Sequence, residues 1–495
     1  MKVMIAYPPL TGKGSPMLTQ NRQFQWMHQG SYLFPVVPAQ AATLLKEEGC
    51  DVVWADAITE QMDWESFEAL FVREKPDLIA IETKTPVVKQ HWKIIADLKA
   101  LRPECLVVLM GDHVTALPEE SMTNSLADYV LTGGDFDFQL LGLMRNLGDG
   151  EPLPPGFWYR AEGEIKSTGQ FKLEHDLNDL PFIDRTLTKA DLYFEKWQKF
   201  SPFYYTMAGR DCHWAKCTFC SWTTTFPKFR ARSPDNVLDE IGMLIEDHGV
   251  KEIFDDSGNF PPGKWLRDFC KGMIDRGYNK KIPISSNMRF GILDEEHVKL
   301  MKRAGWRKFK MGLESANQNT LDRIRKGCTV QDIVDGAKWI SNAGIDIHLT
   351  VMVGFPWETR ADAENTVKLA RSLMDRGHAE MLQSTVLVPY PGTPLHKEAL
   401  EKDWFRIDPL DYERYDMTEP AFKLPDMTPD EALEVCQKIY KSFLSPKYVL
   451  RTLGRVRSWN DVNYILRGSK AVVNHMFDFG KKRQKQTKGE KVPTA

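Results

Sequence analysis

Residues 210–222 read RDCHWAKCTFCSW and place Cys212, Cys217 and Cys220 within nine residues. The spacing C-x4-C-x2-C is compatible with three kinds of site. A structural zinc site needs four ligands, and the only nearby fourth donor, His213, is adjacent to Cys212 and poorly placed to share its metal. A disulfide would leave one thiol over in a reducing compartment. A [4Fe–4S] cluster held by three thiolates would keep its fourth iron open to a ligand that is not protein.

The segments after the cysteines alternate between helix and strand patterns. Helical apolar spacing covers 236–250, 265–278, 294–306, 331–344 and 362–377, and strand patterns cover 251–260, 282–291, 308–318, 345–359 and 381–395. This alternation predicts a parallel α/β sheet, whose ligands bind at the carboxyl ends of the strands. The residues that close these strands are Asp255, Asp256, Ser257, Asn287, Arg289, Glu314, Ser315, Gly354 and Tyr390.

The types of these residues suit a zwitterionic nucleoside ligand. Arg289 and Ser315 can pair with a carboxylate, and Glu314 can pair with an ammonium group or a ribose hydroxyl. Gly354 allows a ligand to approach the backbone closely. The alternative is that the acids and the arginine form ion pairs at the barrel mouth while the glycine only turns the chain.

The first 145 residues show a second α/β alternation. Strand patterns at 2–9, 50–57, 77–85, 105–110 and 127–134 are separated by amphipathic helix patterns at 36–49 and 90–103. Short, almost continuously apolar strands of this kind predict a doubly wound sheet. Its ligand edge would consist of the loops at 82–86, 111–118 and 132–138.

At these motifs the chain resembles the radical S-adenosylmethionine (SAM) enzymes that carry an N-terminal cobalamin domain. The CTFC ending at 217–220 matches that family, and four strand-end segments resemble it in order: DDSGNF (255–260), GLESANQNTLDRIRKG (312–327), VGFPWET (353–359) and VPYPGTPL (388–395). One residue departs, because four residues instead of three separate the first two cysteines. The resemblance implies a Rossmann-like cobalamin-type sheet, then a partial (β/α)6 TIM-like barrel and a helical C-terminal region.

The resemblance also implies the cofactors and their ligands. The [4Fe–4S] cluster would be held by Cys212, Cys217 and Cys220, and SAM would be bound by Asp256, Ser257, Arg289, Glu314, Ser315 and Gly354. Cobalamin would contact Thr83, Thr85, His113, Thr115, Gly133 and Gly134. Asp112 directly precedes His113, so the Asp-x-His-x-x-Gly pattern of cobalt-ligating domains is absent, and we expect cobalamin without a lower axial histidine. The alternative ligand of this sheet is a nucleotide, although no G-x-G-x-x-G or P-loop is present.

Charge divides the chain unevenly. The net charge is -3, yet the residues from 446 onward contain twelve Lys and Arg against three Asp and Glu. Leucine, valine and isoleucine recur at helical spacing among these arginines, so the segment can lie on an anionic membrane or bind an acidic partner, or it can be an ordinary surface helix. It lacks the aromatic interleaving of a nucleic-acid platform. We therefore expect no nucleic-acid partner.

These patterns predict five regions and one reaction class. We expect a cobalamin-binding-type domain (1–145), a linker (146–200), a radical SAM barrel (201–400), a helical region that closes the barrel (401–480) and a disordered basic tail (481–495). The expected reaction is methylation of an unactivated carbon through cobalamin by way of a 5′-deoxyadenosyl radical. The alternatives are a radical cyclisation or rearrangement, with cobalamin assisting or absent, and a regulatory protein that binds the cofactors without turnover.

Partners and location follow from the same reading. We expect a small-molecule substrate, lipid-like or otherwise hydrophobic, because the carboxyl end is basic and amphipathic. Trp214, Trp222 and Trp357, near the predicted mouth, fit an apolar cavity. The resemblance implies an external one-electron donor such as flavodoxin or ferredoxin. The chain shows no secretory signal and no run of roughly 20 apolar residues. We expect it in the cytoplasm, with membrane association through its basic end.

Overall fold

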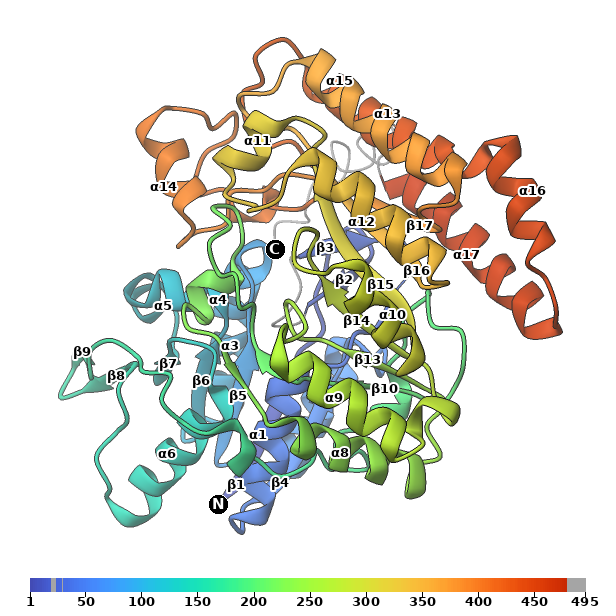
Figure 1. The fold of residues 1–495 in the computed structure, drawn as a ribbon. Coiled ribbons are helices and arrows are strands. Elements are labelled where there is room, and N and C mark those ends of the chain that lie inside the picture. The colour runs from blue at the N-terminus through green and yellow to red at the C-terminus, as the bar shows by residue number, and fades with distance from the viewer. Residues whose placement is uncertain (19–23, 29, 479–495) are drawn as a thin grey trace.

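Two mainly parallel sheets, one in each half of the chain, organise the computed structural model, which describes residues 1–18, 24–28 and 30–478 (Figure 1). The first sheet has the order β4-β1-β5-β6-β7-β8-β9. Its parallel strands are β1 (Lys2–Tyr7), β4 (Asp51–Asp56), β5 (Leu78–Glu82), β6 (Leu106–Met110) and β7 (Tyr129–Leu131). Counted along the chain, this is the doubly wound order 2-1-3-4-5, in which ligands bind near the switch point between β1 and β5.

Both faces of the first sheet are buried because its side chains alternate. Val3, Ile5 and Tyr7 pack on the side of α1 (Val36–Glu47) and α6 (Phe136–Asp149). Met4 and Ala6 face a separate core, which includes residues of α2 (Trp64–Glu74), α3 (Val88–Leu101) and α5 (Pro118–Asn124). The core on the α1 side continues into the second half of the chain. The two halves therefore share one apolar core.

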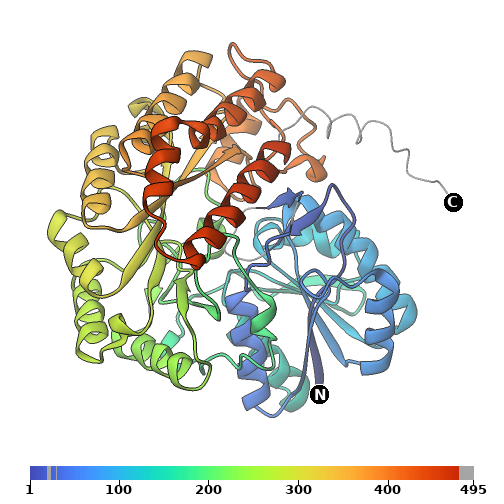
Figure 2. The ribbon, with the colours of Figure 1, turned by 90° about the vertical axis from the view of Figure 1, so that its right-hand side faces the viewer.

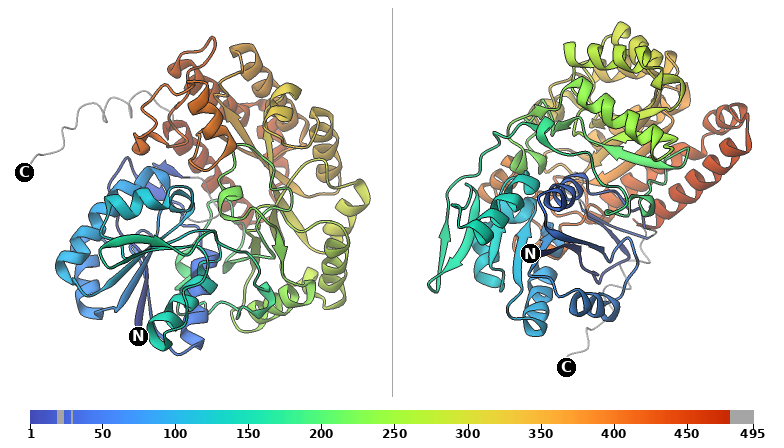
Figure 3. Two further views of the ribbon diagram at one scale, coloured as in Figure 1. Left: turned by 90° about the vertical axis from the view of Figure 1, so that its left-hand side faces the viewer. Right: turned by 90° about the horizontal axis from the view of Figure 1, so that it is seen from below.

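The second sheet is a partial barrel of six parallel strands in chain order. The strands are β10 (Phe203–Thr206), β13 (Glu252–Asp255), β14 (Ile284–Met288), β15 (Trp306–Glu314), β16 (Asp346–Val353) and β17 (Met381–Val386). The connecting helices are α8 (Pro234–Glu246), α9 (Lys264–Asp275), α10 (Glu295–Arg303), α11 (Gln318–Arg323), α12 (Val330–Asn342) and α13 (Arg360–Arg376). The predicted doubly wound sheet and partial barrel are thus confirmed, and Figure 3 shows them side by side.

Several elements differ from the sequence-based expectation. A hairpin of β2 (Ser15–Met17) and β3 (Gln25–Met27) follows β1, and α4 (Asp112–Ala116) occupies the predicted loop 111–118. A second hairpin, β8 (Phe157–Ala161) and β9 (Glu164–Ser167), falls in the predicted linker and extends the first sheet as an antiparallel edge. The hairpin of β2 and β3 and the helix α4 escaped prediction because each has too few residues to show a period.

Helices at the carboxyl end cover the barrel from outside. They are α14 (Pro394–Glu401), α15 (Pro429–Tyr440), α16 (Pro446–Gly454) and α17 (Trp459–Asp478). The Tyr440 hydroxyl accepts a hydrogen bond from the Ser384 backbone N–H at 3.0 Å, so α15 lies against β17. The Tyr464 hydroxyl of α17 lies 3.3 Å from the sulfur of Met381, where β17 begins. Figure 2 shows α16 and α17, in red, in front of the barrel ribbon.

The remaining expectations about the carboxyl end concern the membrane and the tail. In the described part of the chain, no helix is both long and apolar enough to cross a membrane. The basic tail expected at 481–495 lies outside the described residues.

Candidate functional site

The cysteine segment begins at Arg210, four residues after the end of β10, and is fixed to the loops around it. Cys212 forms a β-bridge with Asn259, which follows β13. The Thr218 N–H donates to the Ile324 carbonyl at 3.0 Å, and the Trp214 indole N–H donates to the Arg325 carbonyl at 2.7 Å. The segment therefore rests on the turn that follows α11.

This turn requires a glycine. Gly327 has φ +69, and a Cβ at this position would lie 2.2 Å from the Trp214 ring. The Arg289 guanidinium lies over the same Trp214 ring, 4.2 Å from its centroid. Its Nη1 donates to the carbonyls of Lys326 and Gly327, both at 2.8 Å. Backbone carbonyls and an aromatic face, rather than an acid, thus hold this cation in place.

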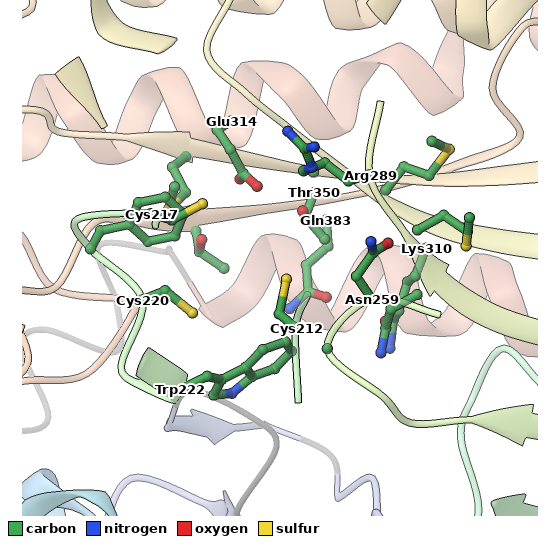
Figure 4. Close-up of a pocket in the computed structure, with 18 of the residues that line it drawn as sticks. Cys212, Cys217, Cys220, Trp222, Asn259, Arg289, Lys310, Glu314, Thr350 and Gln383 are labelled. Atoms are coloured by element: carbon green, nitrogen blue, oxygen red, sulfur yellow. The ribbon is translucent and has the colours of Figure 1, made fainter. Parts of the chain in front are cut away.

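All three cysteines line one cavity of about 270 Å³ at the carboxyl ends of the barrel strands (Figure 4). Arg289 and Glu314, two of the residues predicted to bind SAM, line it as well. In the described ranges, no three His, Cys, Asp or Glu side chains converge on a position for a single metal ion. An iron–sulfur cluster does not require its thiolates to converge on one point, because each thiolate binds a different iron atom.

Burial and nearby cations set the charge state of the thiols. Burial raises the pKa of all three cysteines, and that of Cys217 to about 11. The Lys326 ammonium and the Arg289 guanidinium oppose this rise at Cys217. A thiol that coordinates a metal is deprotonated, so these cations would stabilise the thiolate form. Lys326 also forms an ion pair with Glu314 at 2.6 Å.

Several buried polar atoms of this region have no protein partner. They are Arg289 Nε, Asn259 Oδ1 and the Ser221 hydroxyl. Buried polar groups are normally hydrogen-bonded, so such atoms indicate a polar ligand that completes the site. The residues therefore fit both a cluster with three thiolates and a charged ligand beside it.

Four other residues predicted to bind SAM are buried beside the cavity and do not line it. Ser257 accepts a hydrogen bond from the Gly209 N–H at 2.9 Å, and the Ser315 hydroxyl donates to Glu358 at 2.6 Å. The backbone N–H of Asp256 donates to the Thr206 carbonyl at 2.8 Å, and Gly354 has φ +93. Here they brace the strand-end loops, and their contact with SAM stays a prediction.

Two of the three tryptophans placed at the mouth line the cavity. Trp214 and Trp222 do, whereas Trp357 does not. Trp357 stacks on the Arg323 guanidinium at 4.0 Å and lies 5.8 Å from the Trp404 ring. An aromatic residue that follows a strand end can turn outward to pack on a neighbouring helix, and the sequence does not show which way it turns.

The residues predicted to contact cobalamin gather at the carboxyl edge of the first sheet. His113 Nδ1 lies 3.1 Å from the Thr85 hydroxyl, and its Nε2 lies 3.2 Å from Glu120. The Thr115 hydroxyl donates to the Gly111 carbonyl at 2.6 Å and accepts from the Gly133 N–H at 3.1 Å. The neighbouring Thr83 hydroxyl lies 2.7 Å from His91 Nδ1. Both ring nitrogens of His113 therefore have protein partners.

This edge meets the cysteine segment directly. The helix α4 contacts α7 (Trp222–Thr225), which begins two residues after Cys220. A Cβ at Gly134 would lie 2.2 Å from the ring of Phe226. The buried hydroxyl of Thr224, on α7, has no protein partner. A polar group bound between the two sheets would therefore find a free hydroxyl next to the predicted cobalamin loops.

A buried ionic cluster joins the same two segments. Arg210, two residues before Cys212, donates from Nη1 to Asp135 and Asp137, both at 3.0 Å, and from Nη2 to Gln40 at 2.6 Å. Arg210 also bonds the second carboxylate oxygen of Asp137. The aspartates belong to the predicted loop 132–138, and Arg210 is 1% exposed. The first sheet's loop is thereby fixed to the start of the cysteine segment.

Sequence reasoning missed several residues that line the cavity. Lys310, Lys326, Thr350, Gln383 and Glu195 all do. Lys310 shares the parity of Glu314 on β15 and forms an ion pair with Glu195 at 3.3 Å. A charged residue at an inward-facing position of a buried strand can be recognised in the sequence, so Lys310 could have been predicted as a site residue. Glu195 carried none, because it lies in an irregular segment before the barrel.

One buried carboxyl at the edge of the first sheet predicts a pH effect. Burial raises the pKa of Glu82 to about 7, and the Tyr7 hydroxyl donates a hydrogen bond to it. Because the folded pKa lies above the ordinary value of 4.5, the folded state loses stability as pH rises from about 4.5 to 7. We expect Glu82→Gln to remove this loss, which amounts to about 3 kcal/mol.

The measurement is urea unfolding of the original chain and of Glu82→Gln at pH 5 and pH 8. The glutamine keeps an acceptor for Tyr7 but does not titrate. The difference in unfolding free energy between the two proteins should therefore shift in favour of Glu82→Gln at the higher pH. An unchanged difference would show that Glu82 does not hold its proton in the folded state.

Comparisons with known proteins agree with this geometry. Residues 30–136 match the B12 binding domain family, and residues 208–370 match the Radical SAM superfamily. An uncharacterized methyltransferase of Pyrococcus horikoshii is 26% identical over 85% of this chain and 90% of its own length. The anaerobic magnesium-protoporphyrin IX monomethyl ester cyclase of Rubrivivax gelatinosus is 24% identical over 84% of this chain and 75% of its own length.

The fold has a solved counterpart of the same extent. The radical S-adenosylmethionine methyltransferase TsrM from Kitasatospora setae, solved with cobalamin and a [4Fe-4S] cluster, superposes with a TM-score of 0.69 at 16% identity. The match covers 96% of this chain and 99% of that one. The comparisons confirm the resemblance that the cysteine segment and the strand-end motifs predicted. The chain is therefore a radical SAM enzyme with an N-terminal B12-binding domain.

Proposed function

We propose that the chain is a cobalamin-dependent methyltransferase that methylates an unactivated carbon of a small molecule. The observation that carries this proposal is the contact between the two ligand edges. The helix α4, at the edge of the B12-binding domain, packs against α7, directly after Cys220. Groups bound at the two edges would thus be neighbours, as the transfer of a methyl group requires.

The chain's own residues would divide the work of binding. Cys212, Cys217 and Cys220 would hold the [4Fe–4S] cluster, and Arg289 would orient the carboxylate of SAM from its fixed position on Trp214. The predicted loops at 82–86, 111–118 and 132–138 would hold cobalamin without a histidine below it. His113 instead links Thr85 to Glu120. When bound, these groups supply a 5′-deoxyadenosyl radical and a transferable methyl group.

The reaction needs two molecules of SAM and an external one-electron donor. One SAM would be cleaved to methionine and the radical, which becomes 5′-deoxyadenosine when it removes a hydrogen atom from the substrate. The other SAM would donate the methyl group and leave as S-adenosylhomocysteine. A carrier such as flavodoxin or ferredoxin would supply the electrons. We also propose that the substrate is largely apolar, because six methionines line the cavity, and thioethers adapt to irregular apolar shapes.

Labelled methyl groups test this function. Anaerobically reconstituted protein, reduced and given SAM with a deuterated methyl group, should transfer that group to candidate substrates, as detected by mass spectrometry. The cyclase among the relatives makes radical cyclisation the second candidate. A product without label, formed together with 5′-deoxyadenosine, would replace the first function with the second.

The basic carboxyl end is the part of the chain that we propose to contact a membrane.

A further inference from the structure

An exposed apolar surface lies on the two C-terminal helices, away from the cysteine cavity. On α17, Trp459, Leu466 and Val473 follow one another at seven-residue spacing and are 81%, 62% and 50% exposed. Seven residues correspond to two helical turns, so these side chains lie along one side of the helix. Tyr464 and Ala471, which face the barrel, belong to another side.

The neighbouring helix α16 also carries exposed apolar side chains. Val449, Leu450 and Leu453 are 40%, 72% and 59% exposed. Figures 1 and 3 show α16 and α17 as a helical hairpin at the edge of the molecule. Single exposed leucines are ordinary, but a gathered set of large apolar side chains marks an interaction surface.

A basic groove runs beside Leu466. It lies between α17 and the starts of β10, β13 and β14, and Lys199, Lys251, Lys281 and Arg467 line it. No Asp or Glu lines the groove among the described residues. Lys199 forms an ion pair with Asp461, whereas Lys251 and Lys281 are exposed. The apolar side chains thus stand next to cations that can meet phosphates.

We infer that the face formed by α16, α17 and this groove binds an anionic phospholipid surface. Basic side chains would meet the lipid phosphates, while Trp459 and the exposed leucines would enter the boundary of the headgroups. Residues 446–495 carry twelve Lys and Arg against three Asp and Glu, whereas the rest of the chain is acidic overall. This asymmetry would turn the basic end toward an anionic bilayer.

A second copy of the chain fits this face less well than lipid does. Self-association through the hairpin would bring two segments of like charge together, which electrostatics opposes. A surface that combines exposed basic side chains with an exposed tryptophan is instead typical of segments that lie in a membrane interface. The surface lies at the amino ends of the barrel strands, so its function can be tested without touching the cavity.

Vesicle flotation of the reconstituted full chain tests the inference. We expect the protein to float with vesicles of phosphatidylcholine that contain about one third phosphatidylglycerol, and not with phosphatidylcholine alone. Binding should weaken as salt rises, because exposed charges are screened. Equal flotation with both vesicles, or none with either, would overturn the inference.

Two pairs of substitutions test the two parts of the surface. Trp459→Ser with Leu466→Ser should lower the partition coefficient at least about tenfold through lost apolar burial. Lys251→Gln with Lys281→Gln should lower it about tenfold through lost attraction to phosphates. The matched control is Lys264→Gln with Lys299→Gln, on exposed positions of α9 and α10, which removes the same charge and should leave binding unchanged.

The outcomes separate lipid from a second copy. The lipid assignment would be overturned if the protein did not bind vesicles and sedimentation showed a dimer that the Trp459 and Leu466 substitutions convert to a monomer. If that variant loses its circular dichroism signature, the lysine pair decides, because both lysines are exposed. Binding of the lysine variant equal to that of the original chain would also contradict the inference. 5′-Deoxyadenosine formation by the lysine variant should be unchanged, which keeps this test apart from the proposed reaction.

Discussion

Replacing Cys212, Cys217 or Cys220 with serine is expected to abolish the iron–sulfur cluster. Three thiolates are the minimum that holds a cluster with one open iron, and all three cysteines line the same cavity. Anaerobically reconstituted protein should contain about four iron atoms per chain, and each variant less than about one. Iron and sulfide analysis, together with the paramagnetic resonance signal of the reduced cluster, measures this loss.

Two other cysteines provide matched controls. Cys50 is partly exposed, as are the three cysteines of the motif, and Cys328 lies near Arg289 but does not line the cavity. Cys50→Ser and Cys328→Ala should keep the full iron content. Loss of iron in Cys328→Ala would instead assign a fourth protein ligand and close the open iron. Full iron content in any of the three motif variants would remove that cysteine from the site.

Replacing Arg210 with methionine should destabilise the protein by about 3–5 kcal/mol. Removing this buried cation leaves Asp137 without an ion-pair partner, while Asp135 keeps its contact with Arg230. An uncompensated buried carboxylate is far more costly than a lost surface contact. Urea unfolding of the metal-free protein measures this change without any contribution from the cluster.

An exposed ion-pair network on the barrel serves as the control for Arg210. Arg276 pairs with Asp235 and Asp239, which are 85% and 57% exposed at their side chains. Arg276→Met should therefore change the unfolding free energy by about 0–1 kcal/mol. Adding Asp137→Asn to Arg210→Met should restore part of the lost stability, because it removes the unpaired charge. Equal effects of the two arginine substitutions would contradict the structural importance of the buried cluster.

The periodic elements of the fold could be predicted from the sequence because they are long enough to show a period. The barrel helices and strands are of this kind, as are α1 and α3. The hairpin of β2 and β3 has strands of three residues each, and Met17 and Met27 line the cavity from it. A hairpin this short has no sequence signal of its own. Its role depends on packing between distant segments.

Only part of the candidate site, too, could be predicted from the sequence. Cysteines at fixed spacing, and Arg289 and Glu314 at strand ends, could be placed in the cavity because sequence position determines where a strand ends. Ser315 follows Glu314 directly, yet its hydroxyl turns to Glu358 and leaves the cavity. Arg210 reaches Asp135 and Asp137 across 73 or more residues of chain. No local pattern could have joined these partners.

Formation of 5′-deoxyadenosine tests most directly whether the three cysteines hold a cluster that cleaves SAM. The full chain is reconstituted with iron and sulfide without oxygen, reduced with dithionite and given SAM, and the nucleoside is measured by chromatography. We predict that the original chain releases 5′-deoxyadenosine and that Cys217→Ser releases none. Iron-complete protein that forms no 5′-deoxyadenosine, with or without candidate substrates, would contradict the account.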